Sequence, residues 1–465
     1  MTCTMICTTT CTRYSAASRQ VVSCWYAVVE LASIVVKYNE GRPMNRSDLN
    51  RRTLVKGAVA TGTAALLSPP AFAQANPIKI GFAMSLTGGL AGGGRQSLLG
   101  FEIWRDEINA KGGLLGRPVQ LVYFDDQSTP ANVPGLYSKL IDVDKVDLVV
   151  SPYATNQIAP AMPIVMQKNM VYMGLFGTDV NANFKYDRYF ATIPNGPDGK
   201  RAPTLGFLEV AAGMNPKPQT IALIAADAEY AQTVIAGARE TVAKLGFRTV
   251  YDRSYPPSTA DYSPIVRAVA AANPDIICIA SYPPDSVGLI RAASEIGIKP
   301  RIFGGAMIGL GFTPIKAQLG PLLNGIVNYD TYVPEPTMKF PGVDEFLKTY
   351  QEKAQAAGVD LHGFFLPPFA YSQMQVLAQA VTAAGSIDQA KIADALRKGT
   401  FNTIVGEIKF GPGGEWQKNR TLTIQFQGVQ PGDVNQFKQA GKQVILHPNE
   451  SKSGTLIEPY VKARG

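Results

Sequence analysis

Apolar and polar residues alternate in blocks along the body of the chain, and each block has the length of a strand or a helix. Residues 78–84 form a short apolar run, as is typical of a strand buried on both faces of a sheet. Apolar residues then recur at near-helical spacing through residues 98–108, and Gly112 and Gly113 are expected to end that helix. Residues 119–124 are expected to form a second strand, which ends at Asp125 and Asp126. The pattern predicts a parallel strand–helix–strand unit, and ligands of such sheets bind where the strands end.

Blocks of the same kind continue through the chain and fall into two sets. The breaker Pro194-Asn195-Gly196-Pro197 separates the sets, so the sequence predicts an α/β protein of two doubly wound lobes with parallel sheets. Turn-like residues at 329–334 and 411–414 are expected to form the second and third crossings of a hinge between the lobes. Residues 421–426 alternate in polarity and are expected to form edge strands. The predicted lobes are residues 74–194 with 334–410, and residues 195–333 with 411–465.

The start of the chain differs from the body. Residues 1–43 lack the pattern of a domain, and we expect them to be an upstream extension of the reading frame. Residues 44–73 have the pattern of an export signal: a charged start, a moderately apolar stretch and small residues up to Ala73. Arg51 and Arg52 resemble the twin-arginine export motif, although an ordinary secretory signal with two adjacent arginines is an alternative. Either signal predicts a periplasmic mature chain that begins after Ala73.

Charge and cysteine content argue against two classes of protein. The formal net charge is +8, but residues 1–73 contain eight Lys/Arg and three Asp/Glu, which leaves 36 basic and 33 acidic residues in the body. That near balance is no footprint for nucleic acid. Cys278 is the only cysteine after residue 24, so the body cannot form an internal disulfide and is not a disulfide-stapled scaffold.

The sequence carries few of the patterns that enzymes use. It has two histidines and contains no HExxH, GxSxG, CxxC or P-loop motif. Five glycines within residues 88–94 do not fit G-x-G-x-x-G and are expected to form a mobile loop. Asp125 and Asp126 are adjacent, so on a strand they point to opposite faces and are better explained as a strand end and turn. An NAD-dependent enzyme stays an alternative on fold class alone, and a ligand-sensing receptor partner is another.

Three stretches together resemble one known family. They are residues 84–88 (MSLTG), 106–113 (DEINAKGG) and 123–126 (YFDD), the last followed by Pro130. The stretches resemble the leucine/isoleucine/valine-binding proteins, which are substrate-binding proteins of ABC importers with the type I periplasmic-binding fold. The resemblance implies two lobes joined by a three-strand hinge, with a small-molecule ligand between them. It also implies a monomer whose partner is a membrane ABC permease, with no catalytic activity, cofactor or metal.

The resemblance places candidate binding residues on the first lobe. Thr155 and Thr178 match hydroxyl positions that follow the third and fourth strands, and Phe176 and Gly177 would offer backbone groups beside Thr178. In the family such groups hold the ligand carboxylate, because unpaired N–H groups at the start of a helix favour an anion. Each threonine taken alone is better explained as a capping or turn residue. Together, after successive strands of one sheet, they favour a site.

The second lobe departs from the family at one position. The resemblance implies that Tyr230 and Tyr282 close over the ligand, although packing at a strand–helix turn explains Tyr282 equally well. Ala306 stands where amino-acid binders of the family carry an acid that pairs with the ligand ammonium. Asp227 or Asp285 could replace that acid, but neither matches its position. Without a partner, a buried ammonium would be costly.

Gly93 is a second departure, because tyrosine is common at this position of the first loop in the family. Like the change at Ala306, it removes a group from the expected pocket. The two departures favour a larger ligand, or a carboxylate that lacks an α-ammonium. The sequence therefore predicts binding of a branched-chain or other hydrophobic amino acid, or of a related aromatic or branched carboxylate.

Overall fold

The computed structural model describes residues 76–464 of the chain. The predicted upstream extension (1–43) and export signal (44–73) lie outside the described residues. Within the part that is described, none of the helices combines the length and the apolar character needed to cross a membrane.

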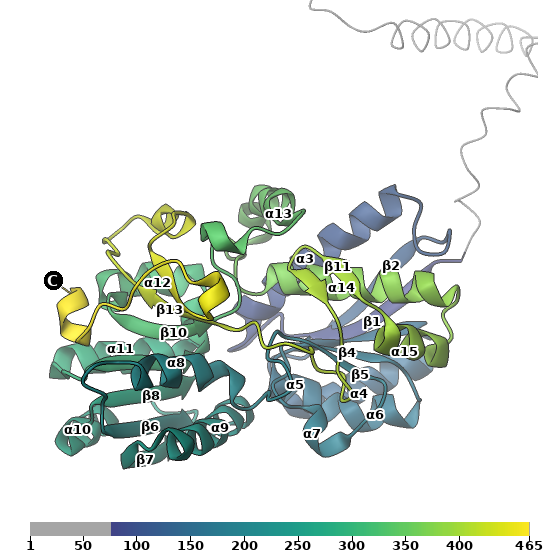
Figure 1. The fold of residues 1–465 in the computed structure, drawn as a ribbon. Coiled ribbons are helices and arrows are strands. Elements are labelled where there is room, and N and C mark those ends of the chain that lie inside the picture. Colours follow the sequence, from purple (N-terminus) through teal and green to yellow (C-terminus); the bar gives the residue numbers. More distant parts are fainter. Residues whose placement is uncertain (1–75, 465) are drawn as a thin grey trace, which may run out of the picture. The chain divides into compact units, whose positions relative to one another are not determined.

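One sheet has five strands, all parallel, in the order β2-β1-β3-β4-β5 (Figure 1). Six of the seven residues of β1 are buried, as its uninterrupted apolar run predicts. The strand order reverses beside β1, which creates a crevice at the carboxyl ends of β1 and β3. The strands are β1 (Ile78–Met84), β2 (Val119–Asp125), β3 (Leu148–Tyr153), β4 (Tyr172–Leu175) and β5 (Tyr189–Thr192).

Helices cover both faces of this sheet (Figure 1). Helix α3 packs against α14 on one face, and Phe101 of α3 contacts Phe82 of β1 edge to face, with ring centroids 5.0 Å apart. The predicted stop at Gly112 and Gly113 is confirmed, because Gly113 N–H closes the last turn on the carbonyl of Ile108 at 2.8 Å. The helices are α3 (Ala91–Ala110), α4 (Val133–Ser138), α5 (Thr155–Ile158), α6 (Met162–Gln167), α7 (Asn181–Phe184), α13 (Val343–Ala357), α14 (Pro367–Ala384) and α15 (Gln389–Lys398).

The glycine-rich stretch is mostly helical, so the prediction of a loop through residue 94 was wrong. Helix α3 begins at Ala91, and Gly92 to Gly94 form its first turns. The N–H of Gly94 donates to the carbonyl of Leu90 at 3.0 Å. The glycines tolerate the helix because tertiary packing of α3 outweighs their low helix propensity.

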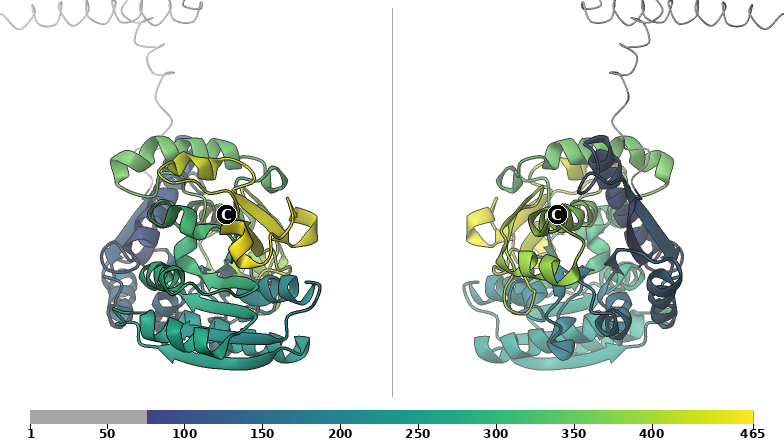
Figure 2. Two further views of the ribbon diagram at one scale, coloured as in Figure 1. Left: turned by 90° about the vertical axis from the view of Figure 1, so that its left-hand side faces the viewer. Right: turned by 90° about the vertical axis from the view of Figure 1, so that its right-hand side faces the viewer.

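A second sheet has seven strands in the order β14-β13-β10-β9-β8-β6-β7. Neighbours from β7 to β10 are parallel, whereas β13 is antiparallel to both β10 and β14. Strands β13 and β14 come from the C-terminal part of the chain and are drawn toward the yellow end of the colour scale in Figure 1 and Figure 2. The strands are β6 (Thr220–Ala226), β7 (Arg248–Tyr255), β8 (Ile276–Ser281), β9 (Ile302–Met307), β10 (Ile326–Asp330), β13 (Leu422–Phe426) and β14 (Gln443–His447).

The prediction of edge strands at 421–426 was wrong, because β13 is an inner strand with all five residues buried. Five helices accompany this sheet, and α8 contacts β9 and β10 while α9 contacts β6, β7 and β8. The helices are α8 (Ala202–Ala212), α9 (Glu229–Leu245), α10 (Ser263–Ala272), α11 (Pro283–Ile296) and α12 (Thr313–Leu319).

The third connection between the sheets comes later than predicted. Residues 411–414 form a turn, in which Gly414 N–H donates to Gly411 at 3.1 Å, and the carbonyl of Gly414 accepts from Ala191 of β5 at 2.7 Å. This turn therefore belongs with the five-stranded sheet. Before this turn the chain forms a small hairpin of β11 (Phe401–Thr403) and β12 (Gly406–Ile408). After the turn it crosses to the second sheet near Asn419, which forms a β-bridge with Asn195 of the first connection. The first and third connections thus lie side by side.

Candidate ligand-binding site

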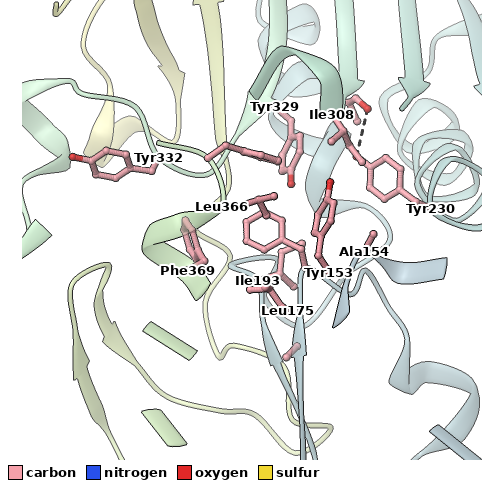
Figure 3. Close-up of a cluster of buried hydrophobic side chains, with 14 of the residues drawn as sticks. Tyr153, Ala154, Leu175, Ile193, Tyr230, Ile308, Tyr329, Tyr332, Leu366 and Phe369 are labelled. Carbon is pink, nitrogen blue, oxygen red and sulfur yellow. Dashed lines mark hydrogen bonds between the residues drawn. The ribbon is translucent and has the colours of Figure 1, made fainter. Parts of the chain in front are cut away.

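The carboxyl ends of strands from both sheets meet around one cavity. β3 and β4 lead into segments that carry Thr155 and Thr178, and β6 and β8 lead to Tyr230 and Tyr282. The reversal of strand order makes this edge of each sheet a place where ligands bind. Figure 3 shows Tyr153 and Tyr230 converging from the two sides. The lining residues are Tyr153, Ala154, Thr155, Phe176, Thr178, Ile193, Tyr230, Tyr282, Ile308, Tyr329 and Phe365.

Five of the seven residues predicted from the sequence lie around this cavity. They are Thr155, Phe176, Thr178, Tyr230 and Tyr282. Gly177 instead lines a separate cavity behind its own segment. Ala306 is fully buried in β9 and is not among the lining residues. The role of all seven as ligand contacts stays a prediction.

Two hydroxyl groups at the cavity have no hydrogen-bond partner among the described residues. They are Thr178 Oγ1 and Tyr153 Oη, and both residues are nearly inaccessible to solvent, with 1% and 2% of their surface exposed. The hydroxyl of Thr155 is satisfied, because it accepts a hydrogen bond from Thr178 N–H at 3.0 Å. An unpaired buried hydroxyl costs about 1–3 kcal/mol, so the two free hydroxyls mark a place where a polar group of a ligand would be stabilised.

The segments that follow β3 and β4 contain three non-glycine residues with positive φ angles. Ala154 has φ 83° and ψ 145°, Phe176 has φ 58° and Asp179 has φ 57°. Such conformations cost on the order of 1–3 kcal/mol each and cluster at ligand sites, where the surrounding structure holds them in place. Here they turn the chain sharply after β3 and β4, which brings Thr155 and Thr178 together.

The second lobe contributes an aromatic wall. The rings of Tyr230 and Tyr282 meet edge to face, with centroids 5.9 Å apart. The hydroxyl of Tyr282 accepts from Tyr230 N–H at 3.2 Å, and the hydroxyl of Tyr230 donates to the carbonyl of Ala306 at 3.4 Å. Burial raises the pKa of both phenols, so they stay neutral and present apolar faces with hydroxyl edges.

Among the residues that the structure describes, no carboxylate lines the cavity. Asp285 is buried, but its Oδ2 accepts hydrogen bonds from the hydroxyl of Tyr255 at 2.5 Å and from Tyr282 N–H at 3.1 Å, so it caps the start of α11. Burial raises the pKa of Asp285. Asp227 is exposed and lies outside the lining. Neither aspartate therefore takes the place of the acid that is missing at Ala306.

Tyr153 fills the space that Gly93 leaves open. A β-carbon built on Gly93 would lie 2.4 Å from Cε1 of the Tyr153 ring, so a side chain at position 93 and this ring exclude each other. The absence of a side chain at Gly93 therefore leaves no open space here, because an aromatic ring reaches the same place from β3. The preference for a larger ligand stays a prediction. The cavity itself measures only about 10 Å³, close to the least volume that holds one water molecule.

A wider cavity adjoins the inner cavity and shares Tyr153 with it. Its volume is about 510 Å³, and it is lined by the turn before α3 and the first residues of α3, by Tyr153, by residues near Phe312 of the second lobe, and by residues 358–360 after α13. The prediction that Asp125 and Asp126 form a strand end and turn is confirmed, because β2 ends at Asp125 and the next N–H groups donate to both carboxylates. The two aspartates also hold the turn after β1. Asp125 Oδ1 accepts a hydrogen bond from Leu86 N–H at 2.9 Å, and Asp126 Oδ1 accepts one from the hydroxyl of Ser85 at 2.7 Å.

Sequence reasoning missed six lining residues, and only some of them left a signal. Tyr153 and Ala154 directly precede Thr155 at the end of an apolar run, so they could have been included. Tyr329 lies on β10, at the residue where the sequence predicts that the second crossing begins. Phe365 comes from the segment before α14, and no local pattern brings it to the end of β3. The missed residues are Tyr153, Ala154, Ile193, Ile308, Tyr329 and Phe365.

Two α/β lobes with a cavity between the carboxyl ends of their strands define a ligand-binding protein of the type I periplasmic-binding class. Residues 77–425 match the family model described as periplasmic binding protein. The match spans most of the chain, and the protein belongs to this family. The family consists of binding proteins of the ABC-transporter substrate-binding type rather than catalysts, which favours the binding interpretation over the NAD-dependent enzyme.

Individual relatives agree with this assignment. A leucine-, isoleucine-, valine-, threonine- and alanine-binding protein of Pseudomonas aeruginosa is 26% identical over 360 residues, which cover 75% of this chain and 92% of the relative. A solute-binding protein of R. palustris, solved with 4-hydroxybenzoate, superposes with TM-score 0.67 at 19% identity, covering 80% of this chain and 95% of the other. A branched-chain amino-acid transporter protein of Streptococcus pneumoniae, solved with isoleucine, gives 0.66 at 18% identity, with 80% and 100% covered. The two structures support the fold.

Proposed function

We propose that this protein binds a small, mainly apolar aromatic or branched carboxylate between its lobes and delivers it to a membrane ABC permease. The observation that carries the proposal is the pair of hydroxyls without a partner among the described residues, Thr178 Oγ1 and Tyr153 Oη, in a wall of uncharged side chains. Two hydroxyl donors suit the two oxygens of a carboxylate, and hydrogen bonds to a charged group are stronger than neutral ones. The surrounding rings suit an apolar body.

An α-ammonium group would find no charged partner among the described residues of this cavity. All eleven lining residues are uncharged, and the carbonyl of Ala306 already accepts from Tyr230. Burying an ammonium against such a wall costs several kcal/mol unless an acid or water reaches it. A carboxylic acid of the same shape avoids that cost. Relatives of the protein include one solved with isoleucine and one solved with 4-hydroxybenzoate, and the uncharged wall favours a ligand of the second kind.

Calorimetry with matched pairs tests the proposal. We expect 4-methylpentanoate to bind more tightly than leucine, and 3-phenylpropanoate more tightly than phenylalanine, by at least about tenfold, or roughly 1.4 kcal/mol. 4-Hydroxybenzoate is a third ligand to compare. Tighter binding of the amino acids would overturn the charge argument. In that case Asp285 or Asp227 would reach the site, and the corresponding Asp→Asn variant would lose the preference.

We also propose that the mature chain acts in the periplasm as a monomer and begins near Gln74. The support is the signal-like pattern of residues 44–73 together with the family, whose members are periplasmic binding proteins. N-terminal sequencing of the exported protein would give Gln74 or a close neighbour as the first residue. Recovery of residues 1–43 in the periplasmic protein would contradict this.

A further inference from the structure

A second cavity, called the rear cavity below, lies behind the segment of residues 176–178 that follows β4. It has no part in the function proposed above. Its volume is about 480 Å³, within the range of small-molecule pockets. Three parts of the chain enclose it: the segment from Gly177 through α7, the first connection near Asn195, and the turn around Gly413. It shares only Ile193 with the inner cavity.

Two walls of this rear cavity, the segment with α7 and the turn around Gly413, are tied to each other and to β5. The side-chain amide of Asn181 donates both to the carbonyl of Gly413 and to that of Tyr186, each at 2.9 Å. The backbone bond from Ala191 to Gly414, 2.7 Å long, holds the turn against β5. Fixed walls of this kind do not close on themselves when the cavity is empty, in contrast to a packing gap between loose side chains.

Two buried polar atoms at the cavity have no partner among residues 76–464. They are Tyr189 Oη and Asn195 Oδ1, in residues that expose only 2% and 3% of their surface. The backbone of Gly177 makes room for the phenol, because a β-carbon there would lie 2.7 Å from Tyr189 Oη. The amide oxygen of Asn195 can only accept hydrogen bonds.

The charged groups of the rear cavity are mostly acidic. Asp179, Asp187 and Glu415 line it, and Lys185 is the one lining cation in the described part of the chain. Asp187 pairs with Arg397 at 3.4 Å. Across residues 76–464, no cation lies within ion-pair distance of Asp179 or Glu415. A ligand here would meet acceptors from two sides.

We infer that the rear cavity binds a small organic cation that carries several N–H donors, such as an alkylammonium or alkylguanidinium compound. Asp179 and Glu415 would pair with its charge, and Asn195 Oδ1 and Tyr189 Oη would take further donors. Carboxylates bind guanidinium and ammonium groups through strong, charge-assisted hydrogen bonds. The site is distinct from the carboxylate site and does not depend on it.

Titration calorimetry of the purified protein with agmatine, which carries both an ammonium and a guanidinium, tests the inference. We expect saturable binding with one site per chain, and binding of the uncharged analogue N-butylurea at least about tenfold weaker. Absence of saturable agmatine binding at millimolar concentration, or equal binding of N-butylurea, would overturn the inference.

Four variants separate the site from general effects of charge and folding. Asp179→Asn and Glu415→Gln should each weaken agmatine binding by about tenfold or more. Ala182→Phe, at an exposed position of α7 on the cavity rim, should block it without disturbing the core. Asp142→Asn removes a surface acid that is paired with Lys168 and should leave it unchanged. Thermal melts identify any variant that has not folded, and undiminished binding in folded Glu415→Gln or Ala182→Phe would refute the site.

Discussion

Replacing Thr178 by valine should raise stability and lower affinity at the same time. The hydroxyl is buried and makes no hydrogen bond to a described residue. A buried hydroxyl without a partner destabilises the folded protein by about 1–3 kcal/mol. Valine keeps the shape of the side chain and removes this hydroxyl. The ligand-free variant should therefore be at least as stable as the parent chain and up to a few kcal/mol more stable.

The same change should weaken binding of the carboxylate. A hydrogen bond to a charged group contributes about 1.5–3 kcal/mol, so the dissociation constant should rise roughly 10- to 150-fold. Thr155→Val is the matched control, because its hydroxyl accepts from Thr178 N–H at 3.0 Å. Removing that acceptor leaves a buried N–H unpaired and should reduce both stability and affinity.

Urea denaturation and calorimetry with 4-methylpentanoate measure the two quantities. Opposite signs of the change in Thr178→Val, and equal signs in Thr155→Val, are the expected results. If Thr178→Val is less stable and binds as well as the parent chain, the hydroxyl has a structural partner such as a water molecule. The assignment of Thr178 to the ligand carboxylate would then be refuted.

Two further predictions concern opening of the lobes and pH. The inner cavity has room for about one water molecule, so we expect a ligand to enter only when the lobes separate at residues 194–197, 329–334 and 419–421. X-ray scattering should then give a smaller radius of gyration for the protein saturated with ligand than for the ligand-free protein. The same scattering profile in both states would count against closure. Burial of Asp330 raises its pKa from 3.8 to about 6. The contribution of this group to the free energy of unfolding is therefore complete below about pH 4 and is lost as the pH rises through 6. The free energy of unfolding should fall by about 3 kcal/mol over that range. Asp330→Asn should abolish that loss and be the more stable protein at pH 7 in urea denaturation, and a less stable variant at pH 7 would contradict this.

The parts of the fold that the sequence reveals are those with strong local signals. Three such signals depend on neighbouring residues: the strand runs of both lobes, the glycine stop after α3, and the alternation of strands and helices. The strand ends follow from the same runs, and in a parallel sheet the ends share one edge. The strand ends group Thr155 with Thr178 on one sheet and Tyr230 with Tyr282 on the other. It is the family resemblance that predicts both pairs at one ligand, and the structure has all four residues around one cavity.

The parts that the sequence does not reveal depend on pairings between distant segments. The glycines at 411–414 look like a connection, yet the turn pairs with β5, and a bridge from Asn195 to Asn419 sets the true crossing. Residues 421–426 alternate in polarity like an edge strand, yet β14 covers β13 and makes it an inner strand. Local pattern gives the element and its length, whereas its neighbours in the sheet are set by long-range contacts.

The pair Gly93 and Tyr153 shows why residue-by-residue transfer of a family's site has a physical limit. What a ligand meets is a volume with certain surfaces, and the volume does not depend on which strand supplies them. Loss of a ring at position 93 would enlarge the pocket only if nothing else could reach the space. The ring of Tyr153 does reach it, coming from β3 across the Cα of Gly93. It also brings a hydroxyl that has no partner among the described residues. The wall therefore keeps an aromatic face at this place although residue 93 is a glycine, while the described lining of the second lobe offers an ammonium no charged partner.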